Sequence, residues 1–163
     1  RGICIGLQLL CQSSEEGDTA CSGIFDNRVR KFDTLFAEAG ILLPDATGTA
    51  APLSDAGSCS ARQADVPADA IILRPAGRLK IPHMGWNSVE NLRSGLFTGI
   101  DQGTYVSYVH SFAPEVNADT IATPTYGVPF SAAIRKDNFY GTQFHPEKSA
   151  SIGAQILQNF LTL

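Results

Sequence analysis

The segment Gly2-Ile3-Cys4-Ile5-Gly6 limits what this chain can fold into more than any other stretch. It is the thiol counterpart of the G-x-S-x-G elbow, in which a strand turns sharply into a helix and exposes a nucleophile. Small flanking residues permit the tight turn, and the apolar run after it predicts a helix from Ile5 to about Gln12. The first amides of that helix should lower the pKa of the Cys4 thiol, and the Ile5 amide is a candidate oxyanion donor. Without a catalytic partner, the same pattern would indicate a buried structural cysteine.

A second segment, residues 140–149, supplies such a partner. It places His145 and Glu147 on either side of Pro146. Because proline disfavours the helical region for the residue before it, we expect His145 to be extended. Residues two apart in an extended segment point to the same side, so the carboxylate can orient the imidazole ring. Cys4, His145 and Glu147 therefore predict a catalytic triad of nucleophile, base and orienting acid.

Composition removes several other classes of function. The chain has 163 residues, enough for one domain with its own core. Its net charge of −4 and 17% charged residues argue against a nucleic-acid surface, and no stretch is apolar enough to span a membrane. We expect no signal peptide, and the spacing of the cysteines and histidines predicts neither disulfides nor a metal site. We expect a cytoplasmic protein without a cofactor. The four cysteines are Cys4, Cys11, Cys21 and Cys59.

Longer stretches around these motifs resemble a known family. Residues 2–10 and 143–147 are similar to the two halves of the class I (triad) glutamine amidotransferase signature. Residues 80–87, which read Lys-Ile-Pro-His-Met-Gly-Trp-Asn, and residues 144–149 resemble the glutaminase subunit of imidazole glycerol phosphate synthase, a histidine-biosynthesis enzyme. Ser13-Ser14-Glu15-Glu16-Gly17 fits the same subunit. The resemblance covers residues 1–32 and 79–163 in order.

The resemblance implies an α/β fold with a flavodoxin-like mixed sheet flanked by helices. In that family several strands and a glycine-rich oxyanion loop precede the elbow, so residues 1–163 are expected to be one partial domain that lacks the N-terminal strands. An oxyanion donor of this kind is typically worth roughly two orders of magnitude in rate. Residues from about 33 to 78 do not match the family well, because the family joins the Phe32 region to the His83 motif far more directly. Because residues 44–70 are rich in small and polar side chains, we predict a flexible insertion there.

The resemblance also assigns roles. It implies that glutamine is hydrolysed to glutamate and ammonia, and that the ammonia passes to a cyclase subunit within a heterodimer. Gln8 would hold the substrate, and the backbone of His110, Ser111 and Phe112 would grip its α-carboxylate and amine. A cyclase-facing surface would include Met84, Trp86, Asn87 and Lys148. From the residues themselves, a solvent-facing Gln8, a core His110 and a core Trp86 are the alternatives.

The pattern of apolar residues predicts the remaining elements. Asp33 is expected to cap a short helix that Gly40 ends, and a C-terminal helix is expected from about Ser151, capped by Ser149 or Ser151. Residues 13–22 read as a loop. Strands are predicted at 23–25, 29–32, 70–73, 104–112 and 121–123, and a hairpin at 130–135 and 139–144.

Three other functions remain open from the sequence. The chain can be the amidotransferase subunit of another synthase, such as one for anthranilate, although residues 84–87 argue against it. It can be a truncated domain that docks on the cyclase without catalysing. It can also be a cysteine peptidase or another thiol hydrolase, which would have no need of the Trp86 surface.

Overall fold

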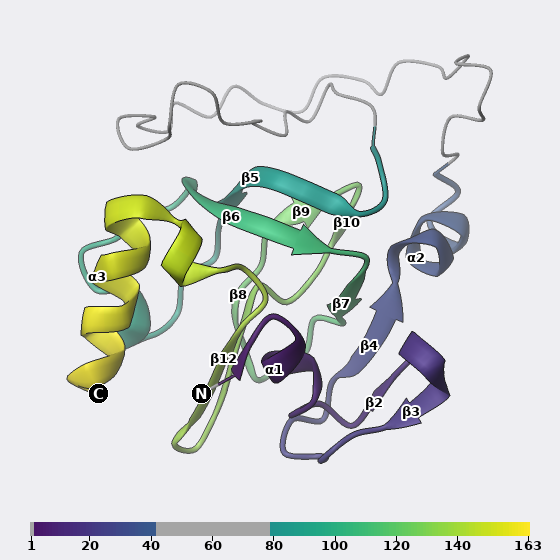
Figure 1. Ribbon diagram of the computed structural model, residues 1–163, viewed down its shortest axis with the longest axis horizontal. Helices are drawn as coiled ribbons and strands as arrows, with labels where there is room; N and C mark the ends of the chain where they lie inside the picture. Colours follow the sequence, from purple (N-terminus) through teal and green to yellow (C-terminus); the bar gives the residue numbers. More distant parts are fainter. Residues whose placement is uncertain (1, 42–78) are drawn as a thin grey trace.

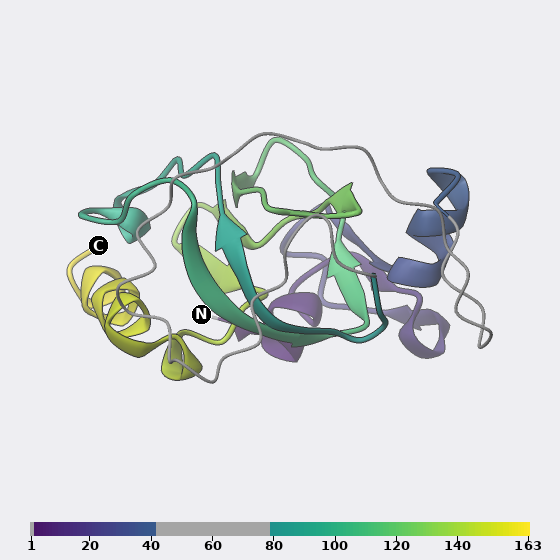
Figure 2. The same cartoon turned by 90° about the horizontal axis from the view of Figure 1, so that it is seen from above.

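The computed structural model describes residues 2–41 and 79–163 (Figure 1). They form a mixed α/β arrangement, as the resemblance predicted, and within the described residues the strands are divided among several small sheets with few helices. Seen from two directions, helices α2 (Phe32–Glu38) and α3 (Ala150–Leu161) lie at opposite ends of the molecule with the sheets between them (Figures 1 and 2). Most of the predicted insertion, including the strand predicted at 70–73, lies outside the described residues.

The sheet that carries the elbow has the order β1-β12-β11-β8. Strand β1 pairs parallel to β12, with Ile3 opposite Thr142, whereas β11 pairs antiparallel with both β12 and β8. Strands β11 and β12 form the predicted hairpin, which turns at Asp137 with φ 54°. Because β1 and β12 run in the same direction, the residues that follow both strands emerge at one edge. The strands are β1 (Gly2–Ile3), β8 (Thr120–Ala122), β11 (Ala133–Lys136) and β12 (Phe139–Thr142).

A second sheet, of order β3-β2-β4-β7, corrects two predictions. The segment 13–22 is not a plain loop but holds two short strands and a 3-10 turn, and residues 23–25 are not a strand. The backbone amides of Gly23 and Phe25 donate instead to the carbonyls of Cys11 and Leu10, so this segment covers the end of α1. The elements are β2 (Ser13–Ser14), η1 (Glu16–Asp18), β3 (Thr19–Ala20), β4 (Arg28–Lys31) and β7 (Phe112–Pro114).

Two long antiparallel strands form a separate ribbon beside these sheets. The register of β5 and β6 runs from His83 opposite His110 to Val89 opposite Thr104. The predicted strand 104–112 is therefore divided, with β6 ending at His110 and β7 starting at Phe112. A short hairpin and a 3-10 turn complete this part. The elements are β5 (His83–Val89), η2 (Gly95–Phe97), β6 (Thr104–His110), β9 (Thr125–Tyr126) and β10 (Val128–Pro129).

The helices differ from their predicted ends. Helix α1 (Ile5–Gln8) stops four residues early, since the amides beyond it take part in turns and in contacts with residues 22–27. Helix α2 begins one residue before Asp33, whose side chain makes no cap, and Gly40 follows it with φ 69°. Helix α3 follows the 3-10 turn η3 (Pro146–Lys148). No helix in the two described ranges is long and apolar enough to cross a membrane.

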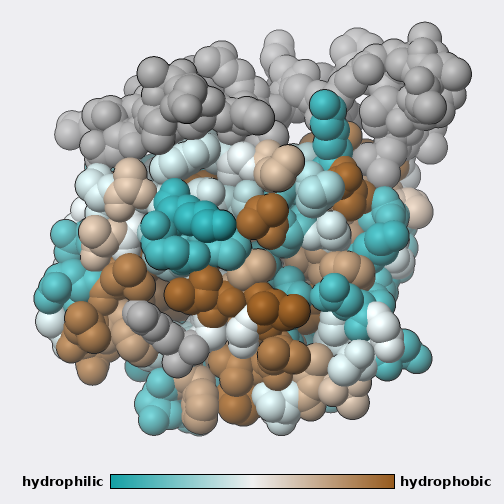
Figure 3. Space-filling model, viewed as in Figure 1, coloured by the Kyte–Doolittle hydropathy of each residue, from teal (hydrophilic) through white to brown (hydrophobic). Residues whose placement is uncertain are grey.

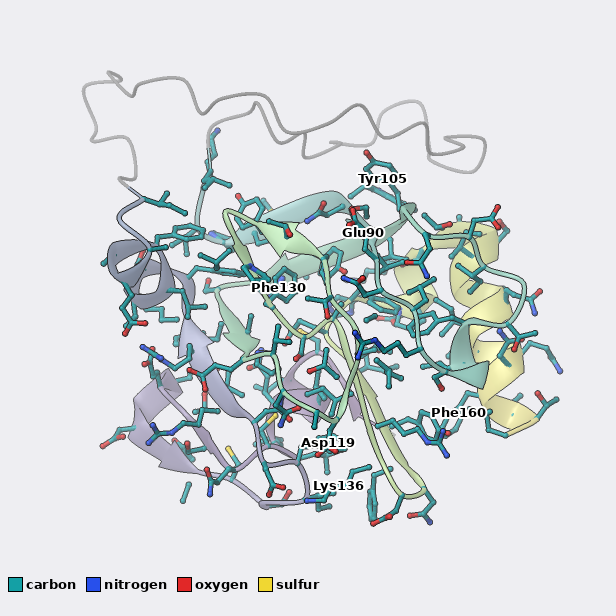
Figure 4. The ribbon with its side chains drawn as sticks, turned by 180° about the vertical axis from the view of Figure 1, so that it is seen from behind. Glu90, Tyr105, Asp119, Phe130, Lys136 and Phe160 are labelled. Carbon is teal, nitrogen blue, oxygen red and sulfur yellow. The ribbon has the colours of Figure 1, made fainter. Side chains whose placement is uncertain are left out.

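The main core is aromatic and lies between the ribbon and the elbow sheet. Phe32 contacts the rings of Phe36, His83, Tyr126 and Phe130 at centroid distances of 5.4 to 5.9 Å. Phe130 has no exposed surface, and Figure 4 shows it near the centre of the molecule. Burying one such side chain contributes about 1.5–3 kcal/mol. A smaller cluster under α1 holds the elbow against β4: Leu7, Cys11, Phe25, Val29 and Ile134.

The apolar side chains of α3 are only partly a packing surface. Ile156 is buried, and Ile152 and Phe160 pack against the main core, but Leu161 is 74% exposed. Ser149 stands directly before the helix, but its hydroxyl makes no capping bond and instead contacts the carbonyl of His145. The cap predicted at Ser149 is therefore wrong, because this hydroxyl is engaged with the segment that precedes the helix.

Candidate active site

Cys4 occupies a sharp turn between β1 and α1, as the elbow pattern predicted. Its backbone has φ 50° and ψ −112°, an unusual conformation for a residue with a side chain, and its amide donates to Thr142 across 2.8 Å. A Cβ on Gly2 would collide with the backbone of Gly6, so the turn requires glycine at position 2. A Cβ on Gly6 would meet nothing within 4 Å. Only the first of the two flanking glycines is needed for space.

The thiol of Cys4 is half-buried, and its pKa lies above the usual value. Burial is the largest cause, the Ile5 amide opposes it, and the carboxylate of Glu147 adds to it. The predicted lowering of this pKa is therefore wrong. Helix α1 has only four residues, so it offers the sulfur few aligned peptide dipoles.

His145 and Glu147 form the expected pair. His145 is extended, with φ −100° and ψ 95°, and its Nδ1 lies 2.7 Å from Glu147 Oε1. The geometry differs from the prediction in one respect, because Glu147 lies in the 3-10 turn η3 and not in an extended segment. Burial is the largest single effect and opposes the ionised form of Glu147. The hydrogen bond from His145, a backbone hydrogen bond and the nearby charges of His145 and Lys148 together outweigh it and lower the pKa of that carboxyl. The ring's other nitrogen, Nε2, is buried and has no hydrogen-bond partner among the described residues.

Strand β6 shows how close the candidate nucleophile and base are. The Cys4 sulfur lies 3.8 Å from the carbonyl oxygen of Val109, and the His145 amide donates to the carbonyl of Ser107 across 2.9 Å. Ser107 and Val109 are two residues apart, about 7 Å along a strand. Cys4 and His145 follow the paired strands β1 and β12, so two independent sets of contacts bring them to the same place.

Two of the predicted substrate-binding side chains, Gln8 and His110, meet at the backbone carbonyl of Phe112. His110 is buried, and its Nδ1 lies 2.8 Å from the carbonyl oxygen of Phe112. Gln8 is buried too, and its Nε2 donates to the same carbonyl across 3.0 Å. Ser111 is half-buried, and its carbonyl accepts from the Phe32 amide. The side chains of Gln8 and His110 are thus engaged with protein groups.

The sequence reasoning did not single out Gln143 and His83. Gln143 has no exposed surface, and its Nε2 lies 3.7 Å from the Cys4 sulfur. His83 is equally buried, with Nδ1 2.7 Å from His110 Nε2. Both residues stand inside the quoted motifs. The one available signal was a polar side chain next to a buried strand, and this signal alone does not separate a site residue from an ordinary strand residue.

Comparison with known proteins matches residues 1–163 to the family described as glutamine amidotransferase class-I. The chain belongs to this family. It is 40% identical over 162 residues to imidazole glycerol phosphate synthase subunit HisH of Bacteroides fragilis, and 39% identical over 164 residues to the protein of the same name from Escherichia coli K12. Each alignment covers 99% of this chain, which spans 62% of the length of either relative. A solved GMP synthase protein from Thermoplasma acidophilum is 23% identical with a TM-score of 0.43, over 52% of this chain and 45% of its own, too low a likeness to carry an argument.

The predicted cyclase-facing residues on the outer face of the ribbon and in η3 are exposed unequally. Met84 is 55% exposed and Lys148 is exposed. Trp86 is on the same face of β5 as Met84 but is only 9% exposed, and Asn87 is buried on the opposite face. Trp86 and Asn87 therefore support this face from within the fold. A partner that covers this face stays a prediction.

Apolar side chains surround the mouth of the candidate active site. Ile5 of α1 and Leu9, which directly follows this helix, are 59% and 55% exposed, and Val109, whose carbonyl faces the Cys4 sulfur, is 39% exposed. Figure 3 shows hydrophobic side chains gathered across the middle of this face. Isolated exposed apolar residues are ordinary, but a group of them beside a reactive thiol is typical of a surface that another molecule covers. In the described part of the chain, no cluster of three or more His, Cys, Asp or Glu side chains is arranged to hold a metal.

Proposed function

We propose that this chain hydrolyses glutamine to glutamate and ammonia through Cys4, His145 and Glu147. The observation that carries the proposal is the state of the His145 ring. One nitrogen is held by Glu147 at 2.7 Å, and the other is buried without a partner among the described residues, beside the strand that contacts the Cys4 sulfur. An imidazole in this state is prepared to accept one proton from a neighbouring group and to return it.

The residues then act in sequence. Cys4 attacks the side-chain amide carbon of glutamine while His145 takes the thiol proton, and the Ile5 amide donates to the developing oxyanion. His145 returns the proton to the departing ammonia, which leaves a thioester on Cys4. Water, activated by His145, hydrolyses the thioester to glutamate. Throughout, Glu147 stabilises the charged imidazolium.

The ammonia is proposed to pass to a cyclase partner that makes imidazole glycerol phosphate in histidine biosynthesis. The names of the relatives support this, as does the exposed apolar group of Ile5, Leu9, Met84 and Val109. Ammonia released into water would be protonated and diluted, so a covered mouth serves the chemistry. We place this heterodimer in the cytoplasm.

The test is glutamate release from glutamine, measured for the chain alone and with the cyclase partner and its ribotide ligand. We expect release with the partner, and none from Cys4→Ala. Cys21→Ala removes a free thiol whose only described contact is the Thr19 carbonyl, and it should keep full activity. If the folded, partner-bound chain releases no glutamate, the catalytic proposal fails and a docking domain remains.

A further inference from the structure

Gln143 has no role in the mechanism above, although its side chain contacts the Cys4 sulfur. It follows β12, has no exposed surface, and its backbone amide donates to the carbonyl of Ala132 across 2.7 Å. A buried polar side chain must satisfy both ends of its amide inside the protein. Its two neighbours are Gln8 at one end and Cys4 at the other.

The orientation of this amide follows from a single carbonyl. The oxygen of Phe112 can only accept, so the Gln8 atom 3.0 Å away must be its NH₂ group. The same NH₂ group is 3.0 Å from Gln143, which must therefore present its oxygen to Gln8. The NH₂ group of Gln143 is left facing the Cys4 sulfur at 3.7 Å.

The histidine pair supports this assignment from the other side. The Ser88 amide donates to Asn87 Oδ1 at 2.9 Å, so the NH₂ group of Asn87 faces His83 Nε2. His83 then carries its proton on Nδ1 and donates to His110 Nε2, and His110 donates from Nδ1 to Phe112. Both rings are neutral, and the Phe112 oxygen accepts from His110 and Gln8 together. Every contact from Asn87 through His83 and His110 to Phe112 therefore has one donor and one acceptor.

We propose that Gln143 is a positioning residue for Cys4. The NH₂ group of Gln143 donates a hydrogen bond to the Cys4 sulfur and stabilises it as the thiolate. A donor to an anion is worth more than a donor to the neutral group, so the bond favours ionisation. It acts against the burial that disfavours the charged sulfur. This role belongs to the same site and rests on the proposed function only for its consequence in catalysis.

The alternative is that Gln143 serves only as a buried acceptor for Gln8. Two substitutions separate the roles. Gln143→Glu retains an oxygen for Gln8 but replaces the NH₂ group that faces Cys4. Gln143→Met has similar length and packing but neither donates to Cys4 nor offers Gln8 a good acceptor. If the methionine variant fails to fold, the glutamate variant still carries the test.

The experiment is the rate of Cys4 alkylation by iodoacetamide across pH 6–10 in the full chain, in a Cys21→Ala background, with labelling at Cys4 read by peptide mass spectrometry. This readout does not require glutamine hydrolysis, so it can succeed or fail independently of the proposed function. We expect the midpoint to move to higher pH in both variants, with alkylation at pH 7 about 10-fold slower. Ser131→Ala, which removes a buried hydroxyl that contacts Thr120 and Glu115, should leave the midpoint unchanged. A lower melting temperature with the wild-type midpoint in both Gln143 variants would overturn the proposal.

Discussion

The hydroxyl of Ser149 donates to the backbone carbonyl of His145 across 2.6 Å. The same hydroxyl accepts from the Ser107 amide at 3.0 Å, and Ser149 has no exposed surface. The Ser149 side chain thus links the segment that contains His145, the candidate base, to strand β6, which also contacts Cys4. The position of the imidazole depends on this serine as well as on Glu147.

Ser149→Ala should therefore affect both stability and turnover. The Ser107 amide loses the Ser149 hydroxyl, and the His145 carbonyl keeps only the Lys148 amide, at a cost of about 1–3 kcal/mol. We also expect kcat for glutamine to fall about 10-fold, since the imidazole loses its fixed position. Urea unfolding and glutamate release measure the two effects. Ser131→Ala is the matched control, as it removes an equally buried hydroxyl away from the site; a Ser149→Ala variant with unchanged kcat would contradict the positioning role.

The two glycines of the elbow should respond differently to alanine. In Gly2→Ala the new Cβ would overlap the backbone of Gly6 and Leu7, and backbone cannot yield as a flexible side chain can. We expect a loss of about 2 kcal/mol or more in the free energy of unfolding. Gly6→Ala enters open space and should change stability by no more than about 0.5 kcal/mol. Chemical denaturation compares the two variants directly, and equal losses would be inconsistent with this packing.

The buried histidine pair predicts acid sensitivity. Burial lowers the pKa of His83 to about 2 and that of His110 to about 4, and each ring is also near another histidine. In the unfolded chain both take up a proton near pH 6.5, while in the folded protein they stay neutral. Their contribution to stability is therefore complete above about pH 6.5 and is lost as the pH falls toward the folded values, by about 1.4 kcal/mol per pH unit for each ring.

The measurement is the free energy of unfolding at several pH values between 7 and 4.5. His83→Phe removes one of the two rings and keeps an aromatic side chain between Tyr108 and Tyr126, although His110 loses its donor. Its stability at pH 7 should fall, but the slope against pH should be shallower by about 1.4 kcal/mol per unit. An unchanged slope would mean that other groups cause the acid sensitivity.

Arg30 connects three carboxylates from separate elements. Its guanidinium pairs with Glu15 and Glu38 at 2.5 Å and with Glu115 at 2.8 Å. The hydrogen bonds to Glu115, Glu38 and Glu15 raise the pKa of Arg30. Arg30→Met would leave three acids facing one another, and we expect a loss of about 1–3 kcal/mol, smaller at high salt.

Lys31→Met provides the comparison for this prediction. Lys31 forms an ion pair with Asp33, and both side chains are 45% exposed. Its removal should cost no more than about 0.5 kcal/mol. Thermal melts at low and high salt measure both variants. Equal effects at the two positions would show that the Arg30 cluster contributes no more than an exposed pair.

Local sequence motifs predicted the candidate site more accurately than they predicted the fold. The elbow at Cys4, the extended His145 with its Glu147 contact, the 133–142 hairpin and the helix ended by Gly40 all depend on a few neighbouring residues. The short strands β2 and β3 were missed because each has only two residues, too few to show an alternating pattern. The early end of α1 was missed for a different reason, since residues 22–27 take up backbone groups that a longer helix would have used.

The sequence by itself determined the chemistry that this protein presents: a thiol on a tight glycine turn, and an imidazole and a carboxylate separated by one proline. These features result from local backbone preferences, which act over a few residues. Only the tertiary structure decided what surrounds them. Burial raised the pKa of Cys4 against the expectation from its helix, and the Phe112 carbonyl, more than 100 residues from Gln8 in the chain, set the orientation of the amide facing the sulfur. Desolvation and hydrogen-bond direction depend on groups that meet only when the chain is folded.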